Sequence, residues 1–177
     1  DLHSFPTRRS SDLAFYFVTE LFTLAKEKGV NTCLDTSGNP FTREEPFYSK
    51  FEKLMEVTDL FMLDIKEIDE DEHKQLTGQT NKNILDMATC LSDHGKAMWI
   101  RHVLVPGITD DDGQLHRLRA FIDTLKTVER VEILPYHTLG VFKWKELGIP
   151  YALEEVEPPT KEQVEHAREI IIPGYKS

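Results

Sequence analysis

The stretch DLFMLDI, residues 59–65, is a nearly unbroken apolar run, and it decides the fold class. A short run of this kind is typical of a β-strand that is covered on both faces, as strands of parallel sheets are. Three further stretches are predicted strands: VNTCLDT at 30–36, AMWIRHVLV at 97–105 and RVEILPYH at 130–137. Helical patterns precede, separate and follow the strands at 14–29, 45–57, 81–95, 110–128 and 158–171. This alternation predicts an α/β fold of right-handed βαβ units around a parallel sheet.

Length and composition indicate one domain of ordinary size. The chain has 177 residues, of which 40% are hydrophobic and 29% charged, as in soluble globular proteins. Its formal net charge of −10 argues against nucleic acid and anionic membranes as partners, because both need clustered positive charge. No apolar run is long enough to span a bilayer. Two cysteines and no signal-peptide pattern favour a reducing compartment, so we expect a cytoplasmic protein, and we expect it to be monomeric.

The first thirteen residues, DLHSFPTRRSSDL, show neither helical nor strand periodicity. Their arginines are not followed by the apolar core that a signal peptide needs. The stretch resembles translated sequencing-adaptor sequence, and a natural disordered tail is the alternative. We therefore predict a non-native or disordered head at 1–13 and one domain at 14–177, with the natural beginning of the protein missing.

Polar side chains lie at or near the carboxyl end of each predicted strand, where parallel α/β proteins gather their functional groups. In chain order they are Asp35 with Thr36, Asp64 with Lys66, Arg101 with His102, and Tyr136 with His137. Carboxylates at such an edge can chelate a hard cation, or hold ribose hydroxyls and an ammonium group. Capping of the helices that follow is the alternative for Asp35 and Asp64, and position alone favours neither.

Three other polar features have simpler interpretations. Arg101 and His102 are neighbours on a strand and face opposite sides, and we expect Arg101 to point inward. Cys33 and Cys90 belong to no CxxC motif, so we interpret both as packing residues. The acidic segment around His73, residues 68–78, is expected to be a solvated acidic face or loop rather than a metal site.

Four motifs, in order and at their separations, carry a resemblance to a known family. They are CLDTSG at 33–38, VTDLFMLDIK at 57–66, WIRHVLVPGITDDD at 99–112 and ILPYHTLGVFKW at 133–144. Over roughly residues 14–172 the chain closely resembles pyruvate formate-lyase activating enzymes, which are radical S-adenosylmethionine enzymes that install a glycyl radical on a partner. The resemblance implies the last four βα units of a partial (β/α)6 TIM-like barrel, with the first two strands missing.

The resemblance also implies a binding site for a monovalent cation. The implied ligands are Asp35, Thr36, Asp64 and the backbone carbonyl of Met62. Paired carboxylates beside a cation, and beside the amino acid group of a cofactor, make electrostatic sense.

For S-adenosylmethionine itself, the resemblance implies contacts from several strand ends. Asp35 and Thr36 belong to a strand motif that helps to bind this cofactor. Lys66 resembles a lysine that contacts the cofactor carboxylate, and His137 resembles a histidine near its adenosine. Arg101 resembles an arginine that faces the cofactor and the target glycine loop, a duty suited to its planar fork.

The chain departs from the family in lacking the CxxxCxxC motif that binds a 4Fe–4S cluster, and the Gly-Gly-Glu motif for the cofactor's amino group. In the family the cluster's electron cleaves S-adenosylmethionine, and the resulting 5′-deoxyadenosyl radical takes a hydrogen from a glycine of the partner. We therefore expect the cluster ligands upstream of this chain, an activase as the full-length parent, and a chain that is inactive alone. An uncovered strand edge at 30–36 predicts poor solubility.

The implied partners are the glycyl-radical loop of pyruvate formate-lyase and a reducing flavodoxin or ferredoxin. Three alternatives stay open. The parent protein could activate another glycyl-radical enzyme. A barrel lyase or aldolase would use Lys66 as a Schiff-base lysine. A non-catalytic half-barrel would bind a nucleotide-like ligand or a peptide.

Overall fold

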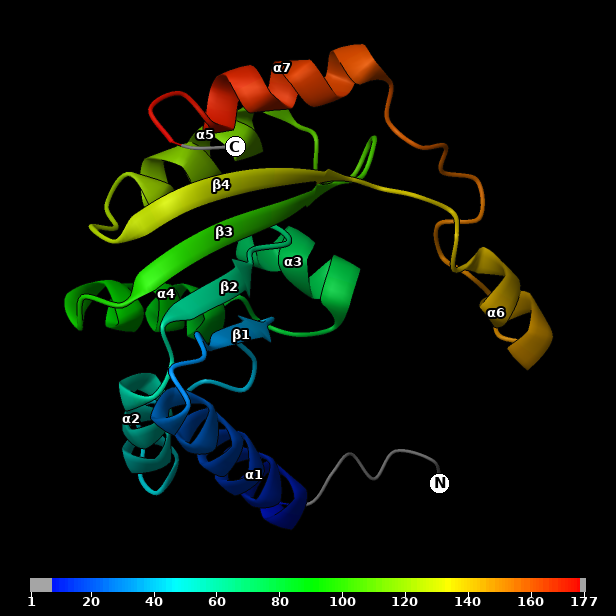
Figure 1. The fold of residues 1–177 in the computed structure, drawn as a ribbon. Coiled ribbons are helices and arrows are strands. Elements are labelled where there is room, and N and C mark those ends of the chain that lie inside the picture. Colours follow the sequence, from blue (N-terminus) through cyan, green and yellow to red (C-terminus); the bar gives the residue numbers. More distant parts are fainter. Residues whose placement is uncertain (1–7, 176–177) are drawn as a thin grey trace.

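The computed structural model describes residues 8–175, with side chains described from residue 14. Four strands form one sheet: β1 (Cys33–Thr36), β2 (Leu60–Asp64), β3 (Ala97–Leu104) and β4 (Val128–Pro135). The strands lie in chain order, and every neighbouring pair is parallel. Figure 1 shows them as a strongly twisted sheet with helices packed alongside. The predicted α/β class and the succession of βαβ units are therefore confirmed.

Within the described residues, helices connect the strands and flank the sheet (Figure 1). They are α1 (Arg8–Glu27), α2 (Phe47–Glu56), α3 (Glu70–Thr77), α4 (Lys82–Asp93), α5 (Asp112–Ile122), α6 (Val141–Leu147) and α7 (Lys161–Ile171). Thr160 caps the start of helix α7, and its hydroxyl accepts from the backbone N–H of Gln163 in a capping box.

Side-chain burial alternates along the strands and separates two faces of the sheet. Phe61 and Leu63 of β2, with Met98 and Ile100 of β3, are fully buried and belong to the hydrophobic core. The residues between them are only half-buried and face the opposite side. The expectation that 59–65 is covered on both faces is therefore wrong for the second face in this chain. That second face carries the polar side chains described below.

Aromatic side chains fix the connection between β1 and β2. The rings of Phe41, Phe47 and Phe51 pack against one another, and Phe51 lies 6.1 Å from the ring of Phe61. Edge-to-face contacts of this kind add to the burial of the rings. They hold α2 on the sheet and so position the loop that follows Thr36.

Gly38 is required where this loop passes over the sheet. Its φ is +74°, in the left-handed region that favours glycine, and an added Cβ would lie 3.0 Å from Cδ1 of Leu63. The backbone therefore approaches β2 closely just after the carboxyl end of β1.

Several boundaries differ from the sequence expectations. Helix α1 begins at Arg8, so residues 8–13 are helical where no structure was expected. Residues 8–13 contain neither glycine nor proline, so their sequence does not interrupt a helix. Residues 1–7 lie outside the described part, and the predicted domain boundary at residue 13 stays a prediction. The first strand is shorter than 30–36, because Thr32 is tied by its amide to Asp59 at 2.9 Å.

Two further differences lie in the second half of the chain. The helix expected at 110–128 ends at Ile122, because Leu125 turns into the core and the amide of Lys126 donates to Ser92 Oγ at 2.8 Å. Helix α6 was not expected at all. It projects beyond the end of β4, and its larger apolar side chains are exposed, so it carries no buried face to predict it (Figure 1).

Candidate functional site

Three strands bring charged side chains together at the carboxyl edge of the sheet. Asp64 of β2 and Arg101 of β3 are register partners. Arg101 Nε donates to Asp64 Oδ1 at 2.8 Å, and Nη2 lies 2.7 Å from the same oxygen. Arg101 Nη2 also donates to Asp35 Oδ1 of β1. One guanidinium therefore bridges two carboxylates that lie 29 positions apart in sequence, 35 and 64.

Lys66 completes this group, because its Nζ lies 3.3 Å from Asp64 Oδ2. Asp35, Asp64, Lys66 and Arg101 are called the edge cluster below. It holds two carboxylates and two basic groups, so its formal charges balance. The side chains of Arg101 and Asp64 are only 16% and 19% exposed, whereas that of Asp35 is 55% exposed. The sequence prediction that these residues share one edge is borne out in their geometry.

Electrostatics within the edge cluster favour the charged form of Arg101. Burial alone would lower the pKa of Arg101, but the hydrogen bonds and charges of Asp35 and Asp64 outweigh it and raise the pKa. The guanidinium is therefore a permanent positive charge at the centre of the cluster.

Helix capping is not the role of either aspartate. Helix α2 begins after Pro46 and α3 after Asp69, whose carboxylate accepts from the amides of Asp71 and Glu72. Asp35 and Asp64 instead face the basic side chains of the edge cluster. The capping alternative is therefore wrong for both.

Thr36 and Met62 lie next to the edge cluster. Met62 is the register partner of Asp35, on the same sheet face as Asp64. Thr36 Oγ1 accepts from the amide of Gly38 at 3.0 Å, which orients the hydroxyl at the start of the loop. The hydroxyl of Thr36 and the backbone carbonyl of Met62, like the two carboxylates, are oxygen ligands of the type that hard cations prefer.

His137 is two residues beyond β4 and is exposed. The preceding residue, Tyr136, is buried and its amide donates to the carbonyl of Leu104 at 3.0 Å, so the sheet-like pairing extends that far. Within residues 14–175, no hydrogen bond or ion pair joins His137 to the edge cluster. The structure therefore places it at the same edge without bringing it into contact.

Arg101 and His102 face opposite sides of the sheet, as predicted. His102 is almost fully buried on the helix side, where its ring contacts the backbone carbonyls of Ile65 and Thr109. Sequence analysis did not assign this residue a role. The motif shows that His102 follows Arg101, but not that its ring is buried between two backbone acceptors.

The two cysteines have different environments. Cys90 of α4 is fully buried in the core, so its interpretation as a packing residue is confirmed. Cys33 is exposed on β1, so the same interpretation is wrong for it. Side chains alternate along β1, so Cys33 and Asp35 face the same side of the sheet. This side is the more exposed one, and β1 is an edge strand.

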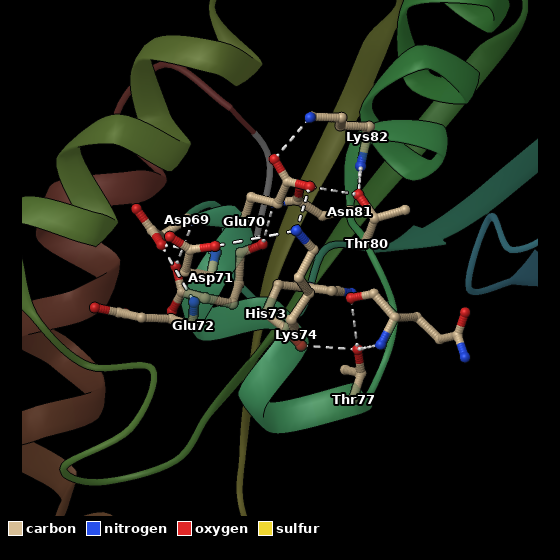
Figure 2. A network of polar contacts seen from close by, with 12 residues as sticks. Asp69, Glu70, Asp71, Glu72, His73, Lys74, Thr77, Thr80, Asn81 and Lys82 are labelled. Atoms are coloured by element: carbon tan, nitrogen blue, oxygen red, sulfur yellow. Dashed lines mark hydrogen bonds and ion pairs between the residues drawn. The ribbon is translucent and has the colours of Figure 1, made fainter.

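Most of the acidic segment 68–78 forms helix α3 rather than a loop, and its carboxylates Asp69 and Glu70 pair with basic side chains. Figure 2 shows Glu70 between α3 and the start of α4. Its carboxylate lies 2.7 Å from Lys74 Nζ and 2.9 Å from Lys82 Nζ, and it accepts from Thr80 Oγ1 at 3.1 Å. These hydrogen bonds lower the pKa of Glu70 to about 2. Among the described residues, no group of three or more His, Cys, Asp or Glu side chains could hold a metal ion.

A cavity of about 230 Å³ lies between α1, α2 and the loop after β1. Its walls are mostly apolar side chains, including Phe15, Phe41 and Phe47, and no residue of the edge cluster lines it. It is therefore no candidate for binding the charged end of a ligand.

A parallel sheet whose carboxyl edge collects acidic and basic side chains is typical of α/β enzymes that bind charged small molecules. The profile of the Radical SAM superfamily matches residues 10–118, more than half of the chain. The chain therefore belongs to the radical S-adenosylmethionine superfamily.

Two curated relatives share a description that is more specific than the superfamily. The pyruvate formate-lyase-activating enzyme of Streptococcus mutans is 57% identical over 155 residues, which are 88% of this chain and 59% of that protein. The enzyme of the same description from Listeria monocytogenes is 50% identical over 155 residues, 62% of its length. The chain thus spans about three-fifths of the length of these curated relatives.

A solved structure agrees in fold. A domain of pyruvate-formate lyase-activating enzyme from Bacteroides vulgatus superposes with a TM-score of 0.73, over 93% of this chain and 89% of that one. At 19% identity this likeness shows the fold alone. In the part of the chain that the structure describes, we find no helix with the length and apolar character of a membrane span.

Proposed function

We propose that this chain forms the S-adenosylmethionine-binding wall of an activase that installs a glycyl radical on pyruvate formate-lyase. The edge cluster is the observation that carries this proposal, because three successive strands deliver balanced charges to one place. Relatives at 57% and 50% identity, both described as pyruvate formate-lyase-activating enzymes, support the choice of partner.

The amino acid end of S-adenosylmethionine carries a carboxylate and an ammonium group. Lys66 and Arg101 would pair with the carboxylate, and the guanidinium suits this because its N–H groups can contact both oxygens. To do so, the two basic groups give up part of their contact with Asp64 and Asp35. The carboxylates of these two residues are then left with less positive charge around them.

A monovalent cation would restore that balance. We propose that Asp35, Thr36, Asp64 and the carbonyl of Met62 hold it. All four supply oxygen, and the pairing of Asp35 with Met62 across β1 and β2 supports their proximity. His137, at the end of β4, is proposed to lie near the adenosine.

This chain offers no ligand set for the 4Fe–4S cluster that supplies the electron for radical chemistry. Cys33 is exposed on β1 and Cys90 is buried in α4, and the sequence has no further cysteine. The residues present do not fit the cluster, so we assign this chain only the binding and orientation of S-adenosylmethionine. The cluster ligands are proposed to come from the part of the relatives that this chain does not match.

The remaining features of the proposal concern the surroundings of the whole protein. We propose that it acts on the glycyl-radical loop of pyruvate formate-lyase, takes its electron from a flavodoxin or ferredoxin, and works as a cytoplasmic monomer. The acidic net charge of −10 suits a protein that avoids nucleic acid and anionic membranes.

The lysine-dependent lyase is less well supported. Lys66 Nζ lies 3.3 Å from a carboxylate oxygen of Asp64 and forms a charge pair with it. A Schiff-base lysine instead needs surroundings, such as an apolar pocket, that keep its amine neutral. Borohydride trapping of a carbonyl substrate on Lys66 would be the result that favours it.

The test uses the chain joined to the segment that precedes the matched region in the Streptococcus mutans relative, with its iron–sulfur cluster reconstituted. Calorimetric titration with S-adenosylmethionine should show binding, and Lys66→Met should weaken it about tenfold or more, since a charge-assisted contact is lost. Lys82→Met, at an exposed lysine of α4, is the matched control and should bind like the parent. Binding without reductive formation of 5′-deoxyadenosine would instead favour a non-catalytic binding module.

A further inference from the structure

A buried polar group lies directly behind the edge cluster. His102 follows Arg101 on β3 and is 2% exposed. Its Nδ1 lies 2.9 Å from the carbonyl oxygen of Ile65, and its Nε2 lies 3.0 Å from that of Thr109. Both distances are typical of hydrogen bonds. One ring therefore joins the carboxyl end of β2 to the turn between β3 and α5.

The two hydrogen-bond partners of His102 determine how many of its ring nitrogens carry a proton. Carbonyl oxygens only accept hydrogen bonds, so each contact needs an N–H from the ring. A neutral imidazole has one N–H, and would leave one buried carbonyl facing a lone pair, which is costly away from water. Only a ring with protons on both nitrogens satisfies both contacts.

Glu67 provides a compensating charge for such a ring. This residue is 1% exposed; its Oε1 accepts from the amides of Ile68 and Asp69, and its Oε2 has no partner in the described residues. Burial raises the pKa of the Glu67 carboxyl and outweighs the two amide donors and the charge of His102, which lower it. The charge of His102 acts on the Glu67 carboxyl, so Glu67 lies within electrostatic range of the ring and can serve as the counter-charge that a buried cation needs.

The other charged groups around Glu67 belong to α3 and to the edge cluster. The charge of Glu72 raises the pKa of Glu67 further. His73 is also buried, and burial followed by the charge of Lys66 holds its pKa below the usual value, although a hydrogen bond to the backbone of Glu67 raises it. A lowered pKa favours the neutral form of His73, so the charge that acts on Glu67 from this side is that of His102.

His102 fixes the peptide that leads into Lys66. The amide of Ile65 donates to the carbonyl of Arg101 at 2.9 Å, and the carbonyl of Ile65 accepts from His102. On the other side of the ring, Thr109 is itself anchored, since its hydroxyl donates to Val103 at 2.7 Å and accepts from the amide of Val105 at 2.8 Å. The exit of β2 is thus held to β3 by both backbone groups of one residue, Ile65.

We propose that His102 is a positioning residue which, with both ring nitrogens protonated and Glu67 as its counter-charge, holds Lys66 and Arg101 in register for an anionic ligand group. The inference rests on the proposed function in that Lys66 and Arg101 are taken to bind the carboxylate of S-adenosylmethionine. His102 itself lies on the opposite face of the sheet from that ligand, and its ring nitrogens contact only backbone carbonyls.

The first test is spectroscopic and needs no ligand. In the folded 177-residue chain labelled with ¹⁵N-histidine, both ring nitrogens of His102 should carry a directly bonded proton. Glu67→Gln should reduce the doubly protonated fraction, because the counter-charge is lost. A single unprotonated ring nitrogen on His102 in the folded parent chain would overturn the proposal, and so would a Glu67→Gln spectrum identical to that of the parent.

The second test measures positioning. His102→Gln should move the Arg101 Nε–H resonance, which reports the contact with Asp64. In the chain extended as described above, it should weaken binding of S-adenosylmethionine about tenfold, at the low end of what residues that orient ligand-binding groups contribute. The matched control is His94→Gln, because Nδ1 of this exposed ring also contacts a backbone carbonyl, that of Cys90, at 2.8 Å.

The outcomes separate the two proposals. A folded His102→Gln variant that binds like the parent and leaves the Arg101 resonance unmoved would refute the positioning role. If the parent itself does not bind S-adenosylmethionine, the proposed function fails, and the ring protons and the Arg101 resonance still decide the case of His102. If His102→Gln does not fold, the spectra of the parent and of Glu67→Gln decide it.

Discussion

Arg101 Nε donates to Asp64 Oδ1 across 2.8 Å, and this bond joins β3 to β2 at their register pair. The same guanidinium reaches Asp35 on β1, so one side chain ties together the carboxyl ends of three strands. In the chain without a ligand this contact is structural. When an anionic group binds, the same basic side chain is available to it, which is why stability and ligand binding should depend on Arg101 together.

Arg101→Leu should destabilise the fold by about 1–3 kcal/mol, because two carboxylates lose a charged donor and Asp64 is mostly buried. The free energy of unfolding in urea measures it. Arg43→Leu is the matched control, since Arg43 pairs with Asp86 where both side chains are 43% exposed, and exposed pairs contribute about 1 kcal/mol or less. Equal losses for the two variants would show that the edge cluster contributes nothing special.

The lowered pKa of Glu70 predicts how the stability of the fold responds to acid. Its hydrogen bonds to Lys74 and Lys82 lower the folded-state pKa of this carboxyl to about 2, from an ordinary value of 4.5. Because the folded pKa lies below the unfolded one, its contribution is full above about pH 4.5 and is lost as the pH falls through about 2. Urea midpoints of Glu70→Gln should therefore fall less steeply than those of the parent across this window. Parallel curves for both proteins would contradict the assignment.

Phe61→Ala should cost about 3–5 kcal/mol, as truncation of a fully buried phenylalanine does. Phe61 is the ring by which β2 contacts the aromatic cluster of α2 and the loop after β1. Leu139→Ala, at a largely exposed side chain, should change the unfolding free energy by less than about 0.5 kcal/mol. A small effect at Phe61 would mean that the core is loosely packed.

Helix α1 should make the chain associate with itself. Its side chains Phe17, Leu21 and Leu24 are exposed, and apolar patches of this kind favour association. Light scattering of the 177-residue chain should show association that rises with concentration, and Leu21→Lys should reduce it more than Glu20→Lys, which adds a basic side chain at a polar site of the same helix. A monomer at high concentration with a sharp cooperative melt would contradict this expectation.

Sequence patterns predict the sheet well because apolar runs and helical periodicity report burial directly. They place β2, β3 and β4 within a few residues and give their parallel order. Helix α6 escapes such patterns because its apolar side chains are not buried, and α3 escapes them because its only buried residue is His73. Periodicity has no signal for elements that lack an apolar face.

The candidate site, like the fold, can be predicted from the sequence only in part. Strand ends and a family resemblance predict that Asp35, Asp64, Lys66 and Arg101 share an edge, and the structure brings them together. The bridge formed by Arg101 depends on side-chain conformation, which strand periodicity does not contain. His102 shows the limit most clearly, since its two acceptors are backbone carbonyls, one after β2 and one in the turn at 105–109, which no sequence pattern identifies.

The most direct measurement is amide shift mapping of the extended chain, labelled with ¹⁵N, during titration with S-adenosylmethionine. If the ends of neighbouring strands enclose one ligand, the signals of Asp35, Asp64, Lys66 and His137 should shift together and saturate at one common concentration. Saturable shifts confined to the amino ends of the strands, or no shifts at these four residues in a folded sample, would contradict the account.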